Sequence, residues 1–355
     1  MVERSSAGKP DDDVDRVLVV ELWHIGDVIL TMPFLAQLRH VFPRARIALA
    51  AKSFAGDLLS GTGLVDDFII SDLSWRPSDN VGLRRKVLGL IEAGRALRMR
   101  RFDIAFSGRG HLRERILLGL SRARRRVAHS GSQGDAFLTD ALPIAAGPHH
   151  KVAAWLTLLD PFGGAVNVQV PRLDVTDPER RWASGYLESH GVGSGDLVIG
   201  IHPGASVAGK RWPLDRFREV AGALASQPGI RVVAFAEPGG YGDELFATPG
   251  VTGARVTLRE LVALIRRCDL LVCNDSGPMH IAGALGVQTV ALFEDGIPDS
   301  FAPLGEGHEL VTSRENSEPL QSIPASRVLE AVERVVSAKR APGISQPSPP
   351  PLSPR

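Results

Sequence analysis

The chain has 355 residues, of which 44% are hydrophobic and 23% charged, and its formal net charge is +1. Such a composition is typical of a soluble globular protein with two domains, and the small net charge argues against nucleic acid as a partner. Two cysteines are too few for a disulfide framework or a four-cysteine metal site. No apolar run reaches membrane-spanning length and residues 1–15 do not read as a secretory signal, so we expect a cytoplasmic protein.

The first informative segment is a strand-like run followed by a helix-like run. We expect a disordered tail over residues 1–14, a buried strand at Val17–Val20 and a helix over residues 28–38. Between the strand and the helix, Gly26 permits a tight turn and the close approach of a ligand. Asp27 falls at the start of the helix, where it is either a helix cap or a functional carboxylate.

Strand-like and helix-like runs continue to alternate through the first half of the chain. Further strands are predicted at residues 46–51, 67–70 and 102–106. This alternation is typical of a parallel sheet with helices on both faces. Residues 109–126 are rich in arginine interleaved with apolar side chains, which indicates a cationic amphipathic helix that is either solvated or in contact with phosphorylated lipid.

A second series of the same kind begins after a linker at residues 171–195. Its first strand, at 197–201, leads into the loop 202–213, where glycines and Ser206 leave backbone N–H groups accessible. Lys210 adds a point charge suited to a phosphate. The alternative is an ordinary loop in which Lys210 and its arginine neighbour are solvated.

The most distinctive turn joins a predicted strand at 270–273 to a helix-like run at 281–285. The turn carries a carboxylate, a hydroxyl, a glycine and an imidazole, namely Asp275, Ser276, Gly277 and His280. The first N–H groups of a helix have no intrahelical partner and favour an anion, so this turn suits a phosphate or pyrophosphate. His280 is either a ligand-binding residue or a histidine packed between helix and sheet.

The remaining pattern completes a second α/β unit. Strands are predicted at 231–235 and 288–293, and residues 327–336 have helical spacing. Residues 341–355 are rich in proline and serine and are expected to be a disordered tail. Asp11–Asp13 is interpreted as solvated charge and His149–His150 as a surface loop, so no metal site is expected.

Three segments together resemble glycosyltransferase family 9, the ADP-heptose heptosyltransferases of lipopolysaccharide core synthesis and their relatives. They are Ile25–Pro33, His202–Ala205 with Lys210–Pro213, and Asn274–His280, in the family's order. The resemblance implies an α/β protein of GT-B architecture, with two Rossmann-like, doubly wound parallel-sheet domains facing a central cleft. In such sheets ligands bind beyond the carboxyl ends of the strands, where all three segments fall.

This resemblance also implies an organisation into domains. The expected parts are a disordered tail at 1–14, an acceptor-side domain at 15–175, a nucleotide-sugar-binding domain at 176–323, a C-terminal helix at 324–340 that packs back on the first domain, and a disordered tail at 341–355.

The implied reaction is an inverting transfer of a sugar from an ADP-sugar to a hydroxyl group, without metal or cofactor. The sugar that the resemblance implies is a heptose. Asp27 resembles the family's catalytic aspartate and would be the general base, while Lys210 would stabilise the diphosphate leaving group. Glu237 would bind the ribose hydroxyls, with Asp243 or Glu244 as alternatives. The expected donor-binding residues are Gly26, Ser206, Glu237, Asp275, Ser276, Gly277 and His280.

Arg109, Arg113 and His24 are the expected acceptor-binding residues, and the acceptor is a glycan or glycolipid. A phosphorylated lipid acceptor would place the enzyme at the inner face of the cytoplasmic membrane. Trp23–His24 and Glu294–Gly296 depart from the usual family pattern. Two alternatives therefore stay open: a glycosyltransferase of a specialised pathway with another nucleotide-sugar donor, and a non-catalytic nucleotide-sugar-binding protein.

Overall fold

The computed structural model describes residues 13–71, 83–131, 133–144, 150–164, 168–294, 298–313 and 318–340. The elements of the first half are β1 (Arg16–Glu21), α1 (Ile25–Val41), β2 (Arg46–Ala51), α2 (Phe54–Leu59), β3 (Asp67–Ile70), α3 (Leu83–Met99), β4 (Ile104–Ser107), α4 (Leu112–Ser121), β5 (Arg125–His129), η1 (Asp135–Phe137), β6 (Asp140–Leu142), α5 (Lys151–Leu156) and η2 (Thr157–Phe162). The elements of the second half are α6 (Asp177–Ser189), β7 (Leu197–His202), η3 (Ala208–Lys210), α7 (Leu214–Ala225), β8 (Ile230–Phe235), η4 (Asp243–Ala247), β9 (Val251–Ala254), α8 (Leu258–Arg267), β10 (Leu270–Asn274), α9 (Gly277–Ala284), β11 (Gln288–Phe293), α10 (Pro298–Phe301), β12 (Glu309–Thr312), η5 (Leu320–Ser322) and α11 (Ala325–Arg340).

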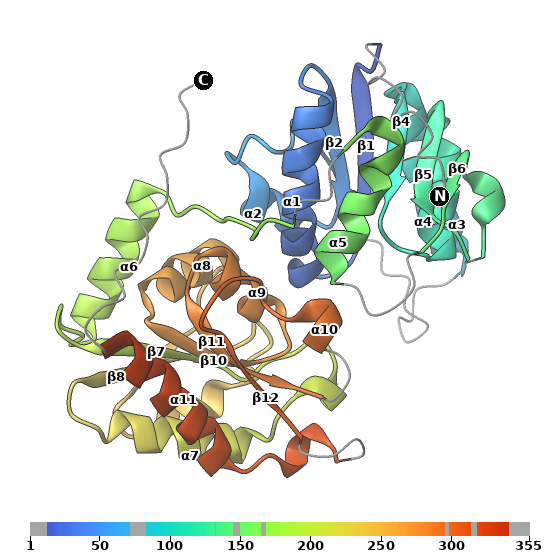
Figure 1. Cartoon of the computed structure of the whole chain (residues 1–355). Coiled ribbons are helices and arrows are strands. Elements are labelled where there is room, and N and C mark those ends of the chain that lie inside the picture. Colours follow the sequence, from blue (N-terminus) through green and yellow to red (C-terminus); the bar gives the residue numbers. More distant parts are fainter. Residues whose placement is uncertain are drawn as a thin grey trace, which may run out of the picture.

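The first sheet is parallel, with the strand order β3-β2-β1-β4-β5-β6 (Figure 1). Because side chains alternate along a strand, neighbours on β1 face opposite sides of the sheet. Val19 packs in the apolar cluster that contains Phe34 of α1 and Trp155 of α5, whereas Leu18 packs in the cluster of Leu97 on α3. Helices thus cover both faces, as predicted for a doubly wound domain.

The second sheet has the same construction, with the order β12-β11-β10-β7-β8-β9 and parallel pairing throughout. Val272 on β10 packs with Phe217 of α7, while its neighbour Cys273 packs on the other face with Ile265 of α8. Both cysteines, Cys268 and Cys273, are buried core residues, as expected. The predicted fold class, two doubly wound parallel-sheet domains, is therefore confirmed.

Several helices and strands were predicted wrongly or not at all, because they are short or rich in charged residues. The predicted cationic helix over 109–126 was too long: α4 ends at Ser121, and Arg125 and Arg126 begin strand β5. Half of the residues of α4 are buried, and even Arg115 is fully buried. The short strands β6, β9 and β12 were not predicted either.

The predicted ends of the chain need correction where the structure describes them. Most of the expected tails, residues 1–12 and 341–355, lies outside the described residues. Val14, placed in the N-terminal tail by the sequence, is only 6% exposed and belongs to the core. The prediction that the helix at 324–340 packs back on the first domain was wrong. Helix α11 lies against α7 and strands β10 to β12 (Figure 1), because Val328, Val332 and their neighbours cover the open face of the second sheet.

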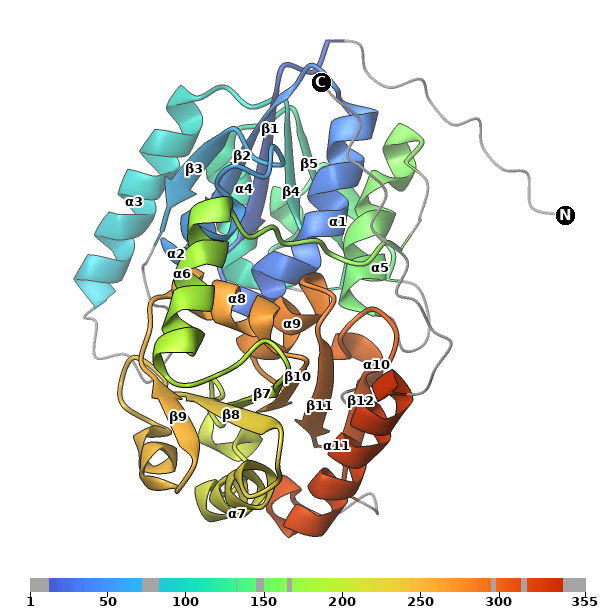
Figure 2. The same cartoon turned by 90° about the vertical axis from the view of Figure 1, so that its left-hand side faces the viewer.

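The two domains meet through α1 and α9, and through α2 and α8 (Figure 2). One apolar cluster runs continuously from Val28 and Leu35 of α1 to Met279 and Ile281 of α9. The starts of these two helices, where two of the three motifs lie, are thereby held together. No helix of the described chain is long and apolar enough to cross a membrane.

Candidate active site

Asp27 lies in the first turn of α1, directly beyond the carboxyl end of β1. Its Oδ2 accepts a hydrogen bond of 3.1 Å from the backbone N–H of His24, the N-cap residue, and lies 3.6 Å from the His24 ring nitrogen Nδ1. The guanidinium of Arg109 pairs with Oδ1. Asp27 is therefore a helix cap, as one interpretation of the sequence held, and also one half of a nearly buried ion pair.

The start of α9 carries an unpartnered hydroxyl in place of a paired carboxylate. Ser276 is the N-cap residue, but its hydroxyl bonds no backbone N–H. The hydroxyl oxygen is buried and has no hydrogen-bond partner among the described residues. Buried polar groups normally have a partner, so this hydroxyl, beside the backbone N–H of Gly277 at the helix start, is available to a ligand oxygen.

The two helix starts interlock through a pair of glycines. A Cβ on Gly26 would lie 2.4 Å from Cδ2 of His280, and a Cβ on Gly277 would lie 2.9 Å from Cβ of Ile25. The sequence interpretation reserved the space beside Gly26 for a ligand, but here the His280 ring occupies it. His280 is nearly buried, and burial lowers its pKa to about 4, so the ring is neutral near pH 7.

The loop after β7 joins the same place from the second domain. Lys210, at the end of η3, forms an ion pair of 2.5 Å with Oδ2 of Asp275. Asn274 anchors the loop by accepting the backbone N–H of Trp212 at 3.1 Å and donating to the carbonyl of Pro203 at 2.6 Å. All three predicted motifs are thus linked by direct contacts, with Lys210 about one-third exposed at the surface of the cluster.

Comparison with known proteins identifies this arrangement. The profile of glycosyltransferase family 9 (heptosyltransferase) matches residues 90–327. The chain belongs to glycosyltransferase family 9. It is similar to lipopolysaccharide heptosyltransferase 2 of Salmonella typhimurium, with 24% identity over 354 residues, which cover 91% of this chain and 99% of the relative.

Solved structures extend the comparison to the fold. A family 9 glycosyltransferase from Veillonella parvula superposes with a TM-score of 0.79 and 25% identity, over 94% of this chain and 100% of that one. The E. coli heptosyltransferase WaaC with ADP superposes with a TM-score of 0.71 and 17% identity, over 90% and 99%. The predicted GT-B architecture is confirmed.

Behind Asp27, this glycosyltransferase has a buried charged cluster that the sequence analysis missed. Glu21 and Glu114 are both fully buried. Burial and the nearby charge of Glu114 raise the pKa of Glu21 to about 7, against the opposing charges of Arg109 and Lys151. Burial and the charge of Arg109 lower the pKa of Lys151 to about 8. The sequence signal that could have indicated this cluster is the glutamate at the end of the buried strand β1.

Trp23 forms an aromatic surface over this cluster. Its indole Nε1 donates a 2.7 Å hydrogen bond to Glu114, whose other oxygen accepts the Ser107 hydroxyl at 2.6 Å. The Trp23 ring centre lies 4.8 Å from the Arg109 guanidinium carbon, 5.7 Å from that of Arg113 and 4.5 Å from the ring centre of His111. The two predicted acceptor-binding arginines therefore converge on the residue that departs from the family pattern.

The remaining donor-side predictions fall around the loop after β7. Glu237 pairs with Arg211 at 2.9 Å and lies so close to Gly204 that a Cβ there would be 2.4 Å from its Oε1. Asp243, an alternative to Glu237, pairs instead with Arg255. Ser206 is exposed at the edge of the loop.

Among the described residues, no group of three His, Cys, Asp or Glu side chains is arranged to hold a metal ion. Asp11, Asp12 and His149 lie outside the described residues, as do Asp295 and Gly296. His150 was predicted in a surface loop, but it is only partly exposed. Its Nε2 lies 3.0 Å from the carbonyl of Ala302 and its Nδ1 caps α5 through the N–H of Val152.

Proposed function

We propose that this chain is an inverting heptosyltransferase that moves a heptose from an ADP-heptose to a hydroxyl group of a lipopolysaccharide-core or other glycan acceptor. One observation carries the proposal: the three family motifs, contributed by two domains, touch one another at the interface. The heptose is inferred from the relatives, which are named lipopolysaccharide heptosyltransferases.

Asp27 would act as the general base. It takes the proton of the acceptor hydroxyl while the hydroxyl oxygen forms a bond to the anomeric carbon of the donor. The bond from that carbon to the diphosphate oxygen breaks, and its electron pair leaves with ADP. Attack from the side opposite the leaving group inverts the anomeric centre. Arg109 pairs with Oδ1 of Asp27 and must yield that oxygen when the acceptor arrives.

Lys210 and the start of α9 would bind the leaving diphosphate. The ammonium group of Lys210, held by Asp275, adds positive charge where negative charge develops on the departing oxygen. The unpartnered hydroxyl of Ser276 and the N–H of Gly277 are suited to the same phosphates. Asp275 is assigned to the donor sugar's hydroxyls and Glu237 to the ribose. A structure of the similar WaaC was solved with ADP, which supports an adenine nucleotide.

The acceptor is assigned to the first domain. Arg109, Arg113 and His24 surround Trp23 and Asp27, and the two arginines suit an acceptor with phosphate or carboxylate groups. We place the enzyme in the cytoplasm, at the inner membrane surface when the acceptor is a glycolipid. The scheme uses no metal, so a chelator is expected to leave turnover unchanged, and inhibition that magnesium reverses would contradict it.

A second candidate is a glycosyltransferase of a specialised pathway that uses another nucleotide sugar. The observation that favours it is the Trp23 ring, stacked by His111 and two arginines in the place where the sequence departs from its family. This candidate keeps Asp27 as the general base and the same leaving-group site, and it changes the nucleotide-sugar donor and the acceptor.

The deciding experiment incubates the protein with a panel of nucleotide sugars, namely ADP-heptose, ADP-glucose, UDP-glucose and GDP-mannose, with and without a lipopolysaccharide-core acceptor. We expect ADP release from ADP-heptose that depends on the acceptor. Release from another nucleotide sugar would favour the second candidate. Tight ADP-heptose binding without turnover, with every acceptor tried, would support a non-catalytic binding protein.

A further inference from the structure

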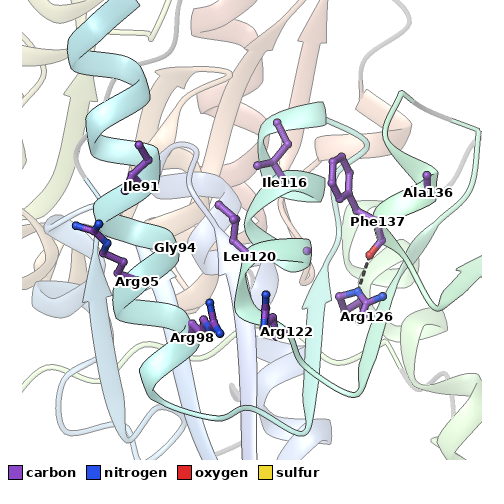
Figure 3. Close-up of a pocket in the computed structure, with 11 residues that line it drawn as sticks. Ile91, Gly94, Arg95, Arg98, Ile116, Leu120, Arg122, Arg126, Ala136 and Phe137 are labelled. Carbon is purple, nitrogen blue, oxygen red and sulfur yellow. Dashed lines mark hydrogen bonds between the residues drawn. The ribbon is translucent and has the colours of Figure 1, made fainter.

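The arginines near the two ends of α4 differ in their surroundings. Beyond its C-terminal end, arginines of α3, α4 and β5 line an open recess of about 590 Å³ (Figure 3), namely Arg95, Arg98, Arg122 and Arg126. The described residues that line this recess include no carboxylate. At the N-terminal end of α4, Arg109 and Arg113 instead lie beside the buried carboxyl groups of Glu21 and Glu114. The arginines at this end therefore have a choice of partners.

Arg109 has more than one carboxyl group within its reach. Its guanidinium pairs with Oδ1 of Asp27, while its Nε is buried and has no hydrogen-bond partner among the described residues. Glu21 is fully buried at the end of β1. Its Oε1 accepts the backbone N–H of Trp23 at 3.2 Å, whereas its Oε2 has no partner in the same part of the chain. Buried polar groups normally have a partner, and here each of two unpartnered atoms is the kind that the other lacks.

Trp23 connects Arg109 with the two glutamates. The guanidinium carbon of Arg109 lies 4.8 Å from the centre of the Trp23 ring. The backbone N–H of Trp23 bonds Glu21, and its indole Nε1 bonds Glu114 at 2.7 Å. The backbone N–H of Arg109 donates to Oγ of Ser107 at 3.3 Å, and this hydroxyl donates to Glu114 at 2.6 Å. Because a guanidinium stacks on an aromatic face, the Arg109 side chain can move along Trp23 while its backbone stays in place.

The charge of Glu21 depends on its neighbours. Burial and the charge of Glu114 raise its pKa to about 7, and the charges of Arg109 and Lys151 act in the opposite direction. Arg113, on the first turn of α4, is a further positive charge near Glu21. Lys151 already bonds a backbone carbonyl at 3.2 Å. Near pH 7 about half of the molecules therefore carry a proton on Glu21, and the arrival of a guanidinium favours its ionised form.

We propose that Arg109 alternates between Asp27 and Glu21: it covers the candidate base while no acceptor is bound, and it turns to Glu21 when an acceptor hydroxyl takes its place. The pair of Arg109 with Asp27 breaks and a pair of Arg109 with Glu21 forms. Where Glu21 was protonated, its proton passes to solvent. Oδ1 of Asp27 is then open to the proton of the acceptor hydroxyl. Glu21 is thus a positioning residue, which acts on the site through Arg109.

A structural role alone does not account for Glu21. The rest of β1 beyond Arg16 is apolar and buried, and an ionisable group in such a strand opposes folding unless it is fully paired. One oxygen of Glu21 lacks a partner among the described residues, so the arrangement seen here is not the one that satisfies it best. The inference rests on the proposed function for the role of Asp27, while the movement of Arg109 can be tested without any substrate.

The first test follows the protonated carboxyl group of Glu21 by infrared difference spectroscopy from pH 5 to 9, because histidine and lysine do not give its C=O stretch. We expect a band that titrates near pH 7 in the wild-type protein and is missing from Glu21→Gln. Asp27→Asn removes the first partner of Arg109, so the midpoint should fall by about one to three pH units. Asp27→Asn/Arg109→Gln should not show this fall. Asp27→Asn/Arg113→Gln, which removes the other arginine beside Trp23, is the matched control and should show it.

The second test uses kinetics with a deacylated lipopolysaccharide-core oligosaccharide as acceptor. Glu21→Gln no longer attracts Arg109, so KM for the acceptor should rise about tenfold while KM for the donor stays within twofold. Glu21→Asp keeps the carboxylate and should recover part of the loss. Glu219→Gln, an exposed glutamate of α7, is the control and should behave like the wild-type protein. Thermal denaturation confirms that each variant is folded.

The two tests separate this inference from the proposed function. Equal infrared midpoints in the wild-type protein and Asp27→Asn, or an equal fall in Asp27→Asn/Arg109→Gln, would overturn the movement of Arg109. Unchanged acceptor KM in Glu21→Gln would remove Glu21 as a positioning residue. If the midpoints move as expected but no sugar is transferred, the proposed function fails and the alternation of Arg109 stands.

Discussion

The two helix starts that meet at the domain interface are alike in local structure and different in charge. At α1, the side chain of Asp27 is already engaged by Arg109 and His24, with Glu21 and Glu114 buried behind it. At α9, the Ser276 hydroxyl has no partner among the described residues, and the adjacent ion pair of Lys210 with Asp275 is partly open. The first arrangement is suited to hold and move a proton, and the second to receive an anion. The comparison therefore divides the site into an acceptor side and a donor side.

The largest effect is expected on the acceptor side, from Asp27→Asn. Loss of the general base should lower turnover about a thousandfold, because proton transfer by a positioned side chain contributes roughly a hundredfold to ten-thousandfold. The measurement is the rate of ADP release in the presence of acceptor. Asp57→Asn, which changes an acidic residue in the first turn of α2, is the matched control and should be fully active. An active Asp27→Asn variant would remove Asp27 as the base.

On the donor side, Lys210→Gln should lower kcat about a hundredfold, the usual cost of removing one group that stabilises developing charge. Lys210→Arg keeps the charge and should recover part of the rate. Steady-state kinetics with the donor varied will test both. Unchanged kinetics in Lys210→Gln would exclude a leaving-group role.

The contact between the two sides is tested by Gly26→Ala. The new methyl group would lie 2.4 Å from Cδ2 of His280, so we expect destabilisation by about 1–3 kcal/mol. Urea unfolding measures the loss, and the double variant Gly26→Ala/His280→Ala should recover part of it, because the smaller side chain makes room. Gly56→Ala in α2 is the control, since nothing lies within 4 Å of its Cβ. Equal stability of Gly26→Ala and the wild-type protein would mean that the helix starts do not meet in this way.

Removal of the aromatic surface should affect the acceptor alone. Trp23→Ala loses the stacking of Arg109 and Arg113 and leaves Glu114 without the indole N–H. We expect KM for the acceptor to rise about tenfold while KM for the donor stays within twofold. Trp23→Phe keeps a ring and should lie between the two. A change confined to the donor KM would reverse the assignment of the two sides.

The smallest expected effect concerns pH. The pKa of Glu21 is raised to about 7, so its contribution to stability is complete below its ordinary pKa near 4.5 and is lost as pH rises through 7. Glu114→Gln removes one charge that raises this pKa, and the loss between pH 5 and 7 should shrink by about 1 kcal/mol. Chemical denaturation of both proteins across this range measures the difference, in which the contributions of the buried histidines cancel. Identical pH dependence would show that the two glutamates do not interact.

The parts of this site that could be predicted from the sequence are local. Asp27, Ser276 and Lys210 each lie in the segment that follows a strand, and parallel strands bring their carboxyl ends to one edge. A strand–turn–helix pattern therefore places all three without knowledge of tertiary contacts.

The parts that could not be predicted depend on segments far apart in the chain. Glu21, Glu114 and Lys151 become neighbours only when β1, α4 and α5 pack together. The contact of Gly26 with His280 depends on how the two domains meet, which no local pattern encodes. The arginines of β5 hid a strand, because its apolar residues Val127 and Ala128 are too few to give a clear period.

The division into a donor side and an acceptor side is tested most directly by titrating ADP into the wild-type protein, Asp27→Asn and Lys210→Gln by calorimetry. We expect ADP to bind the wild-type protein and Asp27→Asn within a few-fold of each other, and Lys210→Gln about tenfold more weakly. The division into two sides would be contradicted if the wild-type protein did not bind ADP, or if Asp27→Asn lost ADP binding while Lys210→Gln kept it.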